Sequence, residues 1–451
     1  MKPFRSFLYI FIILSGFCVV SFFMLDEAPK SEPEKIETDT LQAVVTSSLI
    51  TDTIIKAVPD SIVVKPDTAE TKYSEIQFLS GDTTILDPFF ETLKHIADFQ
   101  SPLRIMYYGD SQIEGDRITS TMRRQFQKKF GGAGIGFIAP ENLYNLTHSF
   151  TVEHSDNLRM ISYHDVNDSL KNNSLVFKEV VLPANQEAWF KIKQIRNKEN
   201  KADYLQLKMF YRSPGDFAVV VKQEGKVIYQ GQINATTEIR ALNFNFSYTP
   251  PSIELFLQST DSLVITGFSL ETKSGIQFDN IALRGLSYPP FSMSDTKSMQ
   301  ETMRLINPGL CILHFGVNIA PSVREKYTYY RSRLVREIRK MKELMPGVPI
   351  LVVGISDMAR KENGEMVSYP NIEAIKKVQK EAARNCGCAF WDLEEFMGGV
   401  GSMVEWVNAD PRLGQKDFVH FTNEGTEKIG EHLSELIISE YEKYLERHPE
   451  E

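Results

Sequence analysis

The sequence predicts a mixed α/β protein with a three-layer α/β/α core, an all-β domain inserted into that core, and one N-terminal transmembrane helix. Three observations support this prediction. Apolar, strand-like segments alternate with amphipathic helical patterns in the early and late parts of the chain. Eight segments with period-2 alternation stand between those parts without a helix. Residues 7–25 form an uncharged apolar stretch of nineteen residues.

The α/β pattern begins after residue 81. Residues 85–97 carry apolar side chains at helical spacing, RIMYY at 104–108 is typical of a short buried strand, and residues 117–130 form the next helical pattern. The alternation returns later as three apolar strands and three helices, at 309–315, 348–354 and 388–393 and at 322–344, 371–384 and 423–447. Such alternation predicts a parallel sheet covered by helices on both faces.

Between these parts the pattern changes to short strands. Eight segments, from SLVFKEVVL at residue 174 to LVITGFSLET at residue 263, are separated by turn residues such as Ser213-Pro214-Gly215. They predict a jelly roll or β-sandwich placed in a loop of the α/β domain. The expected boundaries are 74–148 and 273–451 for the α/β domain and 149–272 for the insert.

The N-terminal stretch predicts a membrane anchor. At about 1.5 Å per residue, residues 7–25 just span a hydrocarbon core of about 30 Å. Basic residues precede the stretch and acidic residues follow it, so the N-terminus is expected in the cytoplasm and the rest of the chain outside. We expect an uncleaved anchor at 1–25 and a flexible acidic tether at 26–73, with a cleaved signal peptide as the alternative.

Charge and cysteine content exclude several classes of function. The chain has 50 Lys and Arg against 59 Asp and Glu, a net charge of −9, which leaves no global basic surface for nucleic acid. Its four cysteines are too few for a disulfide scaffold and include no CxxC zinc pair. The glycine run at 131–136 follows a helix and lacks GxGxxG spacing. We therefore expect it to form a tight loop that lines the active site, and not a nucleotide-binding site.

Ser111 and His420 are the residues that point to chemistry. Ser111 comes directly after a strand and before a helix, which is the edge where open α/β sheets bind ligands, although a serine there is often a plain helix cap. His420 lies just before the last helix, with Asp417 three residues upstream. In a Ser-His-Asp triad the carboxylate fixes the histidine tautomer and Nε2 takes the serine proton. We therefore predict Ser111, His420 and Asp417 as catalytic residues.

Two further residues could stabilise a developing oxyanion. Asn318, in the GVN that follows the strand at 309–315, could aim its side-chain amide at the anion. Gly285, in LRGLS, could offer its backbone N–H, as could Ser111. The alternatives are a turn residue for Asn318 and a backbone requirement for Gly285.

GDS, a later lone glycine, GxN and a C-terminal DxxH, each at a strand end, together resemble the SGNH (GDSL-type) hydrolase superfamily. The resemblance covers residues 76–438 and implies a flavodoxin-like three-layer core. YGDSQIEGDRIT and DFVHFTNEG look most like bacterial cell-envelope members, and the architecture resembles peptidoglycan O-acetylesterases, whose core is interrupted by a carbohydrate-binding-type β-sandwich. The chain departs from the frequent GxND pattern, because Ile319 stands where that pattern has an acid.

The resemblance implies a serine esterase that removes O-acetyl groups from an envelope glycan such as peptidoglycan, without a metal or cofactor. A glycan O-acyltransferase with the same triad and a non-catalytic glycan-binding protein are the alternatives. The expected partners are an acetylated glycan and the inner membrane, the latter through residues 7–25, and neither nucleic acid nor nucleotide. The expected location is the bacterial cell envelope, with the catalytic domain in the periplasm, or outside the cell if the N-terminal segment is cleaved.

Overall fold

The computed structural model describes residues 75–141, 149–165, 171, 173–195 and 203–449. The transmembrane helix and tether expected at 1–25 and 26–73 therefore lie outside the described residues. Among the helices that are described, none combines the length and the apolar character needed to cross a membrane.

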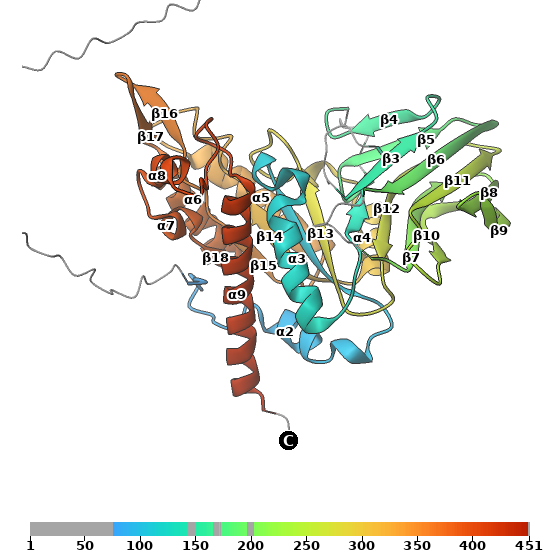
Figure 1. Ribbon diagram of the computed structural model, residues 1–451, viewed down its shortest axis with the longest axis horizontal. Helices are drawn as coiled ribbons and strands as arrows, with labels where there is room; N and C mark the ends of the chain where they lie inside the picture. Colours follow the sequence, from blue (N-terminus) through green and yellow to red (C-terminus); the bar gives the residue numbers. More distant parts are fainter. Residues whose placement is uncertain (1–74, 142–148, 166–170, 172, 196–202, 450–451) are drawn as a thin grey trace, which may run out of the picture. The chain divides into compact units, whose positions relative to one another are not determined.

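A five-stranded parallel sheet lies at the centre of the described chain (Figure 1). Its order is β13-β1-β14-β15-β18, which is 2-1-3-4-5 when the strands are counted along the chain, the flavodoxin-like order. The strands are β1 (Leu103–Gly109), β13 (Ile276–Ala282), β14 (Pro308–His314), β15 (Ile350–Val353) and β18 (Ala389–Trp391). The predicted mixed α/β architecture is confirmed.

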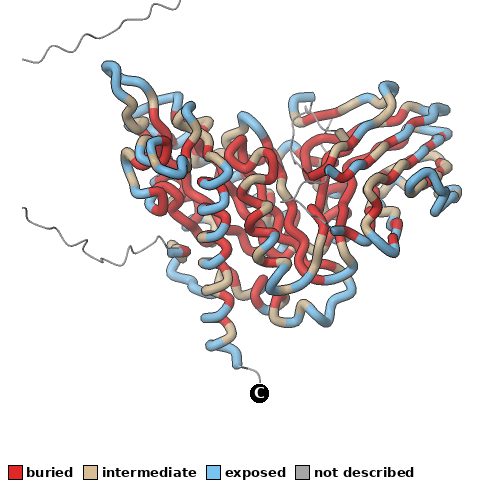
Figure 2. Tube along the Cα trace, in the orientation of Figure 1, coloured by how far each residue is buried: buried red, intermediate tan, exposed pale blue. Residues whose placement is uncertain are grey.

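Helices cover both faces of this sheet. Successive side chains of a strand point to opposite faces, so each strand contributes to a hydrophobic cluster on each side. On β1, Met106 and Tyr108 join one hydrophobic cluster, whereas Ile105 and Tyr107 join the other. The first cluster is closed by α4 (Thr296–Ile306), α5 (Thr328–Leu344) and α6 (Ile372–Cys386). The second is closed by α2 (Asp87–Lys94), α3 (Arg117–Phe130), α7 (Leu393–Met397), α8 (Ser402–Asn408) and α9 (Asn423–Arg447). Figure 2 shows the buried segments gathered in the sheet and on the sides of the helices that face it.

Three short helices and one hairpin complete the α/β part. The hairpin precedes α6 and pairs two strands in antiparallel register. These elements are η1 (Ile96–Asp98), η2 (Ser111–Asp116), η3 (Phe291–Met293), β16 (Ala359–Glu362) and β17 (Glu365–Ser368). The sequence pattern predicted neither this hairpin nor α4, α7 and α8.

Two antiparallel sheets lie between β2 (Gly136–Ile138) and β13 along the chain, with the orders β10-β7-β12-β5-β4 and β3-β6-β11-β8-β9. Their facing side chains share one hydrophobic cluster, in which the rings of Phe190 and Phe268 lie 5.2 Å apart. The strands are β3 (Phe150–His154), β4 (Arg159–Ser162), β5 (Lys178–Leu182), β6 (Gln186–Gln194), β7 (Gln206–Ser213), β8 (Phe217–Gln223), β9 (Lys226–Ile233), β10 (Thr236–Asn245), β11 (Ser252–Ser259) and β12 (Leu263–Glu271). All eight predicted strands are present, and β3 and β4 are additional.

Buried ion pairs join the sandwich to the central sheet. Arg104 of β1 pairs with Glu271 of β12 and, at 2.7 Å, with Asp279 of β13, and all three side chains are fully buried. Strand β2 (Gly136–Ile138) also pairs with β12. The described residues belong to one compact unit, so the predicted domain boundaries stay a prediction.

The glycine run at 131–136 lies at the opposite edge of the sheet from the site described below. The backbone N–H of Ile276, the first residue of β13, donates to the Gly131 carbonyl at 2.9 Å. A Cβ on Gly132, whose φ is +95°, would collide with the Ile276 backbone. The glycines permit this close approach at the amino ends of the strands, so the prediction that the loop lines the site is wrong.

Candidate active site

The five predicted site residues lie at the carboxyl edge of the central sheet. Gly109, the last residue of β1, is in register with Ala282 of β13 on one side and His314 of β14 on the other. The chain segments that carry Ser111, Gly285 and Asn318 therefore leave the sheet at the same edge, with the serine between the other two. Ser111 opens η2 and is 8% exposed.

Ser111, His420 and Asp417 form one chain of hydrogen bonds. The Oγ of Ser111 lies 2.9 Å from Nε2 of His420, and Nδ1 of His420 lies 2.7 Å from Oδ2 of Asp417. Because Nδ1 faces a carboxylate, it carries the proton, which leaves the Nε2 lone pair to accept from the serine hydroxyl. This arrangement can move a proton from serine to histidine.

A tight turn lets the aspartate reach the histidine ring in its own loop. Oδ1 of Asp417 accepts the backbone N–H groups of Val419 and His420, each at 3.0 Å. Phe418, the residue directly after Asp417, has a φ of +59°, in the left-handed region. The side chains of Asp417 and His420 are 46% and 29% exposed, so the acid and base end of the chain is open to solvent.

The surroundings shift the pKa values of Asp417 and Asp110 in opposite directions. Partial burial alone would raise the pKa of Asp417, but hydrogen bonds from the His420 ring and from the backbone N–H groups of His420 and Val419 lower it below its usual value. Burial raises the pKa of Asp110 to about 7, against the effect of the backbone N–H groups of Gln112 and Gly316. Asp417 is therefore the carboxylate at neutral pH that can stabilise an imidazolium.

Asn318 ties together the two segments on either side of β1. Its Nδ2 donates to the backbone carbonyl of Leu286 at 2.8 Å, next to Gly285. A side-chain amide has two N–H groups, so one is used in this bond and the second is the one that could reach an oxyanion. Gly285 has a φ of +80° and is exposed. The described hydrogen bonds do not join Gly285 or Asn318 to Ser111.

Gln112 and Arg117 also contact this site. The side chain of Gln112 donates to the Val419 carbonyl at 2.8 Å. Arg117 donates to the Phe421 carbonyl at 3.2 Å and to the Ser111 carbonyl at 3.1 Å. In the sequence, Gln112 directly follows Ser111, and Arg117 begins the helical pattern at 117–130, where it could cap the helix or help to hold the site.

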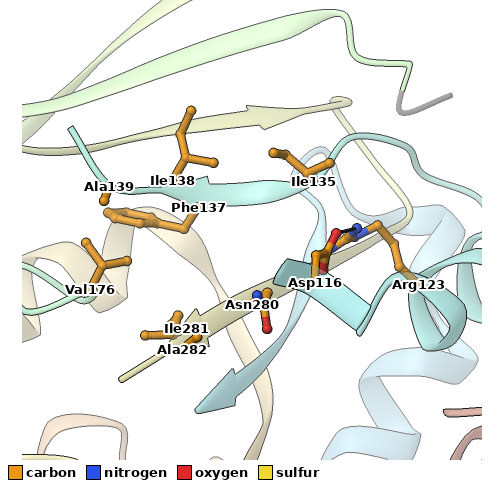
Figure 3. Close-up of a pocket in the computed structure, with 10 residues that line it drawn as sticks. All are labelled: Asp116, Arg123, Ile135, Phe137, Ile138, Ala139, Val176, Asn280, Ile281 and Ala282. Atoms are coloured by element: carbon orange, nitrogen blue, oxygen red, sulfur yellow. Dashed lines mark hydrogen bonds and ion pairs between the residues drawn. The ribbon is translucent and has the colours of Figure 1, made fainter. Parts of the chain in front are cut away.

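A small cavity lies behind the site, between β2, β13 and the start of α3 (Figure 3). Its lining is apolar except for Asn280 and the buried ion pair of Asp116 and Arg123, whose atoms approach to 2.6 Å. At about 20 Å³ the cavity can hold one water and no substrate. Within the described ranges, no cluster of three or more His, Cys, Asp or Glu side chains is placed to hold a metal ion.

The outer face of the β3-β6-β11-β8-β9 sheet carries a groove of about 440 Å³. Trp189, Phe256 and Val220 stand in one cross-strand row in it, and the two rings are 39% and 36% exposed. Four aromatic residues of the insert could stack on sugar rings. Of these, Trp189 and Tyr229 are exposed, whereas Tyr204 and Tyr211 are buried in the sandwich core. We call the face lined by Trp189, Phe256, Val220, Glu187 and Gln258 the aromatic groove.

No family model matches the sequence, and no curated protein does. A solved structure described as a peptidoglycan O-acetylesterase in action is 19% identical, has a TM-score of 0.63, and is matched over 81% of this chain and 98% of its own. Family two carbohydrate esterases from Cellvibrio japonicus (8% identity, TM-score 0.25, 66% of this chain and 99% of that one) and Clostridium thermocellum with cellohexaose (11%, 0.25, 62% and 98%) also match. The first likeness shows a shared fold.

Proposed function

We propose that the protein is a serine esterase of the SGNH type that removes O-acetyl or other short acyl groups from a cell-envelope glycan such as peptidoglycan. The observation that carries the proposal is the unbroken hydrogen-bond chain from Ser111 through His420 to Asp417. Nucleophilic catalysis by serine requires a histidine that accepts the hydroxyl proton and a carboxylate that orients this histidine. The chain of hydrogen bonds supplies both.

In the first half of the proposed reaction, Ser111 Oγ attacks the acyl carbonyl carbon and its proton passes to Nε2 of His420. The carbonyl electrons move to the oxygen, where the N–H groups of Ser111, Gly285 and the Asn318 amide would stabilise the charge. When the carbonyl re-forms, the bond to the sugar oxygen breaks and His420 returns the proton to that oxygen. The products are the free sugar hydroxyl and an acyl-serine.

In the second half, water attacks the acyl-serine. His420 takes a proton from the water, and the new tetrahedral anion uses the same donors. Breakdown releases the carboxylic acid, and the proton on His420 returns to Ser111. The exposed imidazole gives water a path to the acyl group.

A carbohydrate substrate is supported by the aromatic groove and by the shared fold. The C–H face of a pyranose ring can lie on an aromatic face while its hydroxyls bond to polar groups at the rim. Trp189 offers such a face, and Glu187 and Gln258 stand in the next row. The Phe256 ring beside it is covered on one side by Lys222, whose Nζ lies 4.5 Å from the ring centroid. The solved structure with the same fold is described as a peptidoglycan O-acetylesterase, and we propose the same class of substrate for this chain.

Location is part of the proposal. Residues 7–25 would anchor the chain in the inner membrane, with residues 26–73 as a tether and the esterase in the periplasm. The intact chain should then be found in the membrane fraction. In a separate experiment, protease added to spheroplasts should degrade the catalytic part. Recovery of the whole chain in the cytoplasmic fraction would contradict this location.

The proposed activity is tested by acetate release from O-acetylated peptidoglycan, with the full chain and with Ser111→Ala. The wild type should release acetate, and the variant should lose on the order of 10⁴-fold or more of the rate. Ser120→Ala is a matched control, because Ser120 lies on α3 and donates to the Arg117 carbonyl. Equal release by wild type and Ser111→Ala would contradict the proposal. Transfer of acyl groups to an acetyl-free glycan, without free acetate, would indicate an O-acyltransferase instead.

A further inference from the structure

We infer that Gln112 and Arg117 are positioning residues that hold His420 against Ser111 from both sides. This inference rests on the proposed function, since it assigns both residues to the same reaction. We call the two side chains the Gln112–Arg117 bracket. Neither side chain touches the His420 ring in the described contacts, so each would act through the backbone that carries the histidine.

The bracket contacts the two peptide carbonyls that flank His420. Gln112 Nε2 donates to the carbonyl of Val419, the residue before the histidine, at 2.8 Å. Arg117 Nη1 donates to the carbonyl of Phe421, the residue after it, at 3.2 Å. The position of the imidazole base is therefore fixed from two directions by side chains from the segment that directly follows the serine.

Arg117 also binds the backbone of the nucleophile turn. Its Nη2 donates to the Ser111 carbonyl at 3.1 Å, and its Nε donates to the Glu114 carbonyl at 2.7 Å. One guanidinium thus spans three carbonyls in two separate chain segments. The planar fork of arginine suits this task, whereas a lysine ammonium is a single point charge that cannot reproduce the fork.

The place of Arg117 in its helix favours a role outside that helix. It is the first residue of α3, where the helix dipole disfavours a cation. Its three hydrogen bonds all lead to backbone carbonyls at the site. A capping role would not explain a cation at this helix end. The hydrogen bonds of Arg117 to carbonyls of the serine segment and of the histidine loop do explain it.

Gln112 extends the same link to a third segment. Its Nε2 lies 3.2 Å from the Ser356 hydroxyl, in the segment after β15, and its side chain is fully buried. The histidine loop keeps its own internal bonds, since Gln415 donates to the Phe421 carbonyl at 2.9 Å and accepts nothing from the bracket. Loss of the bracket should therefore displace the loop as a unit and not unfold it.

Such a displacement has a kinetic consequence. A general base must lie within about 2.6–3.2 Å of the proton that it takes. A misplacement of about 1 Å typically costs on the order of 10²-fold in rate. Because both side chains of the bracket bond to backbone carbonyls and act through the position of the histidine, we expect the loss in kcat and little change in KM.

The test uses full-length Arg117→Ala, Arg117→Lys and Gln112→Met with p-nitrophenyl acetate. Arg124→Ala is the matched control, because Arg124 lies on the same helix and pairs at 3.1 Å with the exposed Glu427. We expect kcat to fall about 10²-fold for Arg117→Ala and about tenfold for Gln112→Met, with KM within about threefold. Added guanidinium ion should restore about tenfold of the Arg117→Ala rate, whereas methylammonium and Arg117→Lys should restore little.

Two results would overturn the inference. One is a kcat for Arg117→Ala within threefold of the wild type. The other is a loss of activity that guanidinium does not restore and that a fall in melting temperature fully accounts for.

If the wild type hydrolyses no ester, the proposed function fails and the bracket is tested by structure alone. A crystal structure of Arg117→Ala should show the distance from Ser111 Oγ to His420 Nε2 lengthened beyond hydrogen-bond reach. An unchanged 2.9 Å would overturn the bracket.

Discussion

The Oγ of Ser111 lies 2.9 Å from Nε2 of His420, although 309 positions separate the two residues in the chain. The sheet explains this proximity. Ser111 follows β1, which has a parallel strand on each side, and His420 precedes α9, which packs beside α3 (Figure 1). The turn that follows β1 and the loop that precedes α9 therefore meet at the carboxyl edge of the sheet.

Asp417→Asn should reduce kcat by about 10³–10⁴-fold, with little change in melting temperature. The amide keeps the size of the carboxylate but cannot stabilise the imidazolium, and it can stabilise the wrong histidine tautomer. Steady-state kinetics on p-nitrophenyl acetate measure this loss. Activity close to that of the wild type would show that the 2.7 Å contact between Asp417 and His420 has no catalytic role.

Asn318→Ala should reduce kcat by about 10²–10³-fold and leave KM nearly unchanged, because the lost donor would act on the transition state. The change also removes the 2.8 Å bond to the Leu286 carbonyl. Leu286→Ala keeps that carbonyl and serves as the control. A variant that raises KM and keeps kcat would place Asn318 in substrate binding instead.

Stability should fall with rising pH because of Glu179 in the sandwich. Burial raises the pKa of Glu179 from 4.5 to about 7, although Asn173 donates to it at 2.9 Å. The folded state therefore holds a proton that the unfolded chain releases. The contribution of Glu179 to the free energy of unfolding is fully present below pH 4.5 and is lost as pH rises to about 7. At about 1.4 kcal/mol per pH unit, the loss is about 3 kcal/mol.

Glu179→Gln isolates this effect, because the amide keeps an acceptor for Asn173 and does not ionise. Urea unfolding at pH 4.5 and pH 8 measures the difference for both proteins. The wild type should lose more stability than the variant between these pH values. An equal loss in both proteins would contradict the raised pKa.

Trp189→Ala should weaken action on polymeric glycan and leave hydrolysis of p-nitrophenyl acetate unchanged. Loss of an apolar face worth about 1.5–3 kcal/mol corresponds to roughly tenfold or more in apparent KM for the polymer. Tyr248→Ala is the control, because Tyr248 is 51% exposed and lies outside the aromatic groove. Equal losses on both substrates, or none on the polymer, would contradict glycan binding at this face.

Much of the fold and site follows from local pattern. The apolar run at 104–108, ended by Gly109 and followed by a helix, predicts Ser111 at a strand end, and β1 and η2 place it there. The DxxH before the last helix predicts that Asp417 can reach His420, which it does at 2.7 Å. These features depend on neighbours in sequence, so one sequence is enough to predict them.

Contacts between distant segments could not be predicted in this way. The bond from Asn318 to Leu286 and the bracket bonds to Val419 and Phe421 end on backbone carbonyls, which every residue possesses. No residue type in the sequence marks such acceptors. The glycine run at 131–136 was misplaced for the same reason, since glycine signals a close approach but not the backbone that it approaches.

Covalent labelling can show whether Ser111 is a nucleophile that His420 activates. The full chain is treated with a serine-reactive fluorophosphonate, digested and analysed by mass spectrometry. We predict one modified peptide, carrying the phosphonyl group on Ser111, and labelling that is lost in Ser111→Ala and strongly slowed in His420→Ala. A folded wild-type protein that stays unlabelled at Ser111, or that is labelled equally fast without His420, would contradict this prediction.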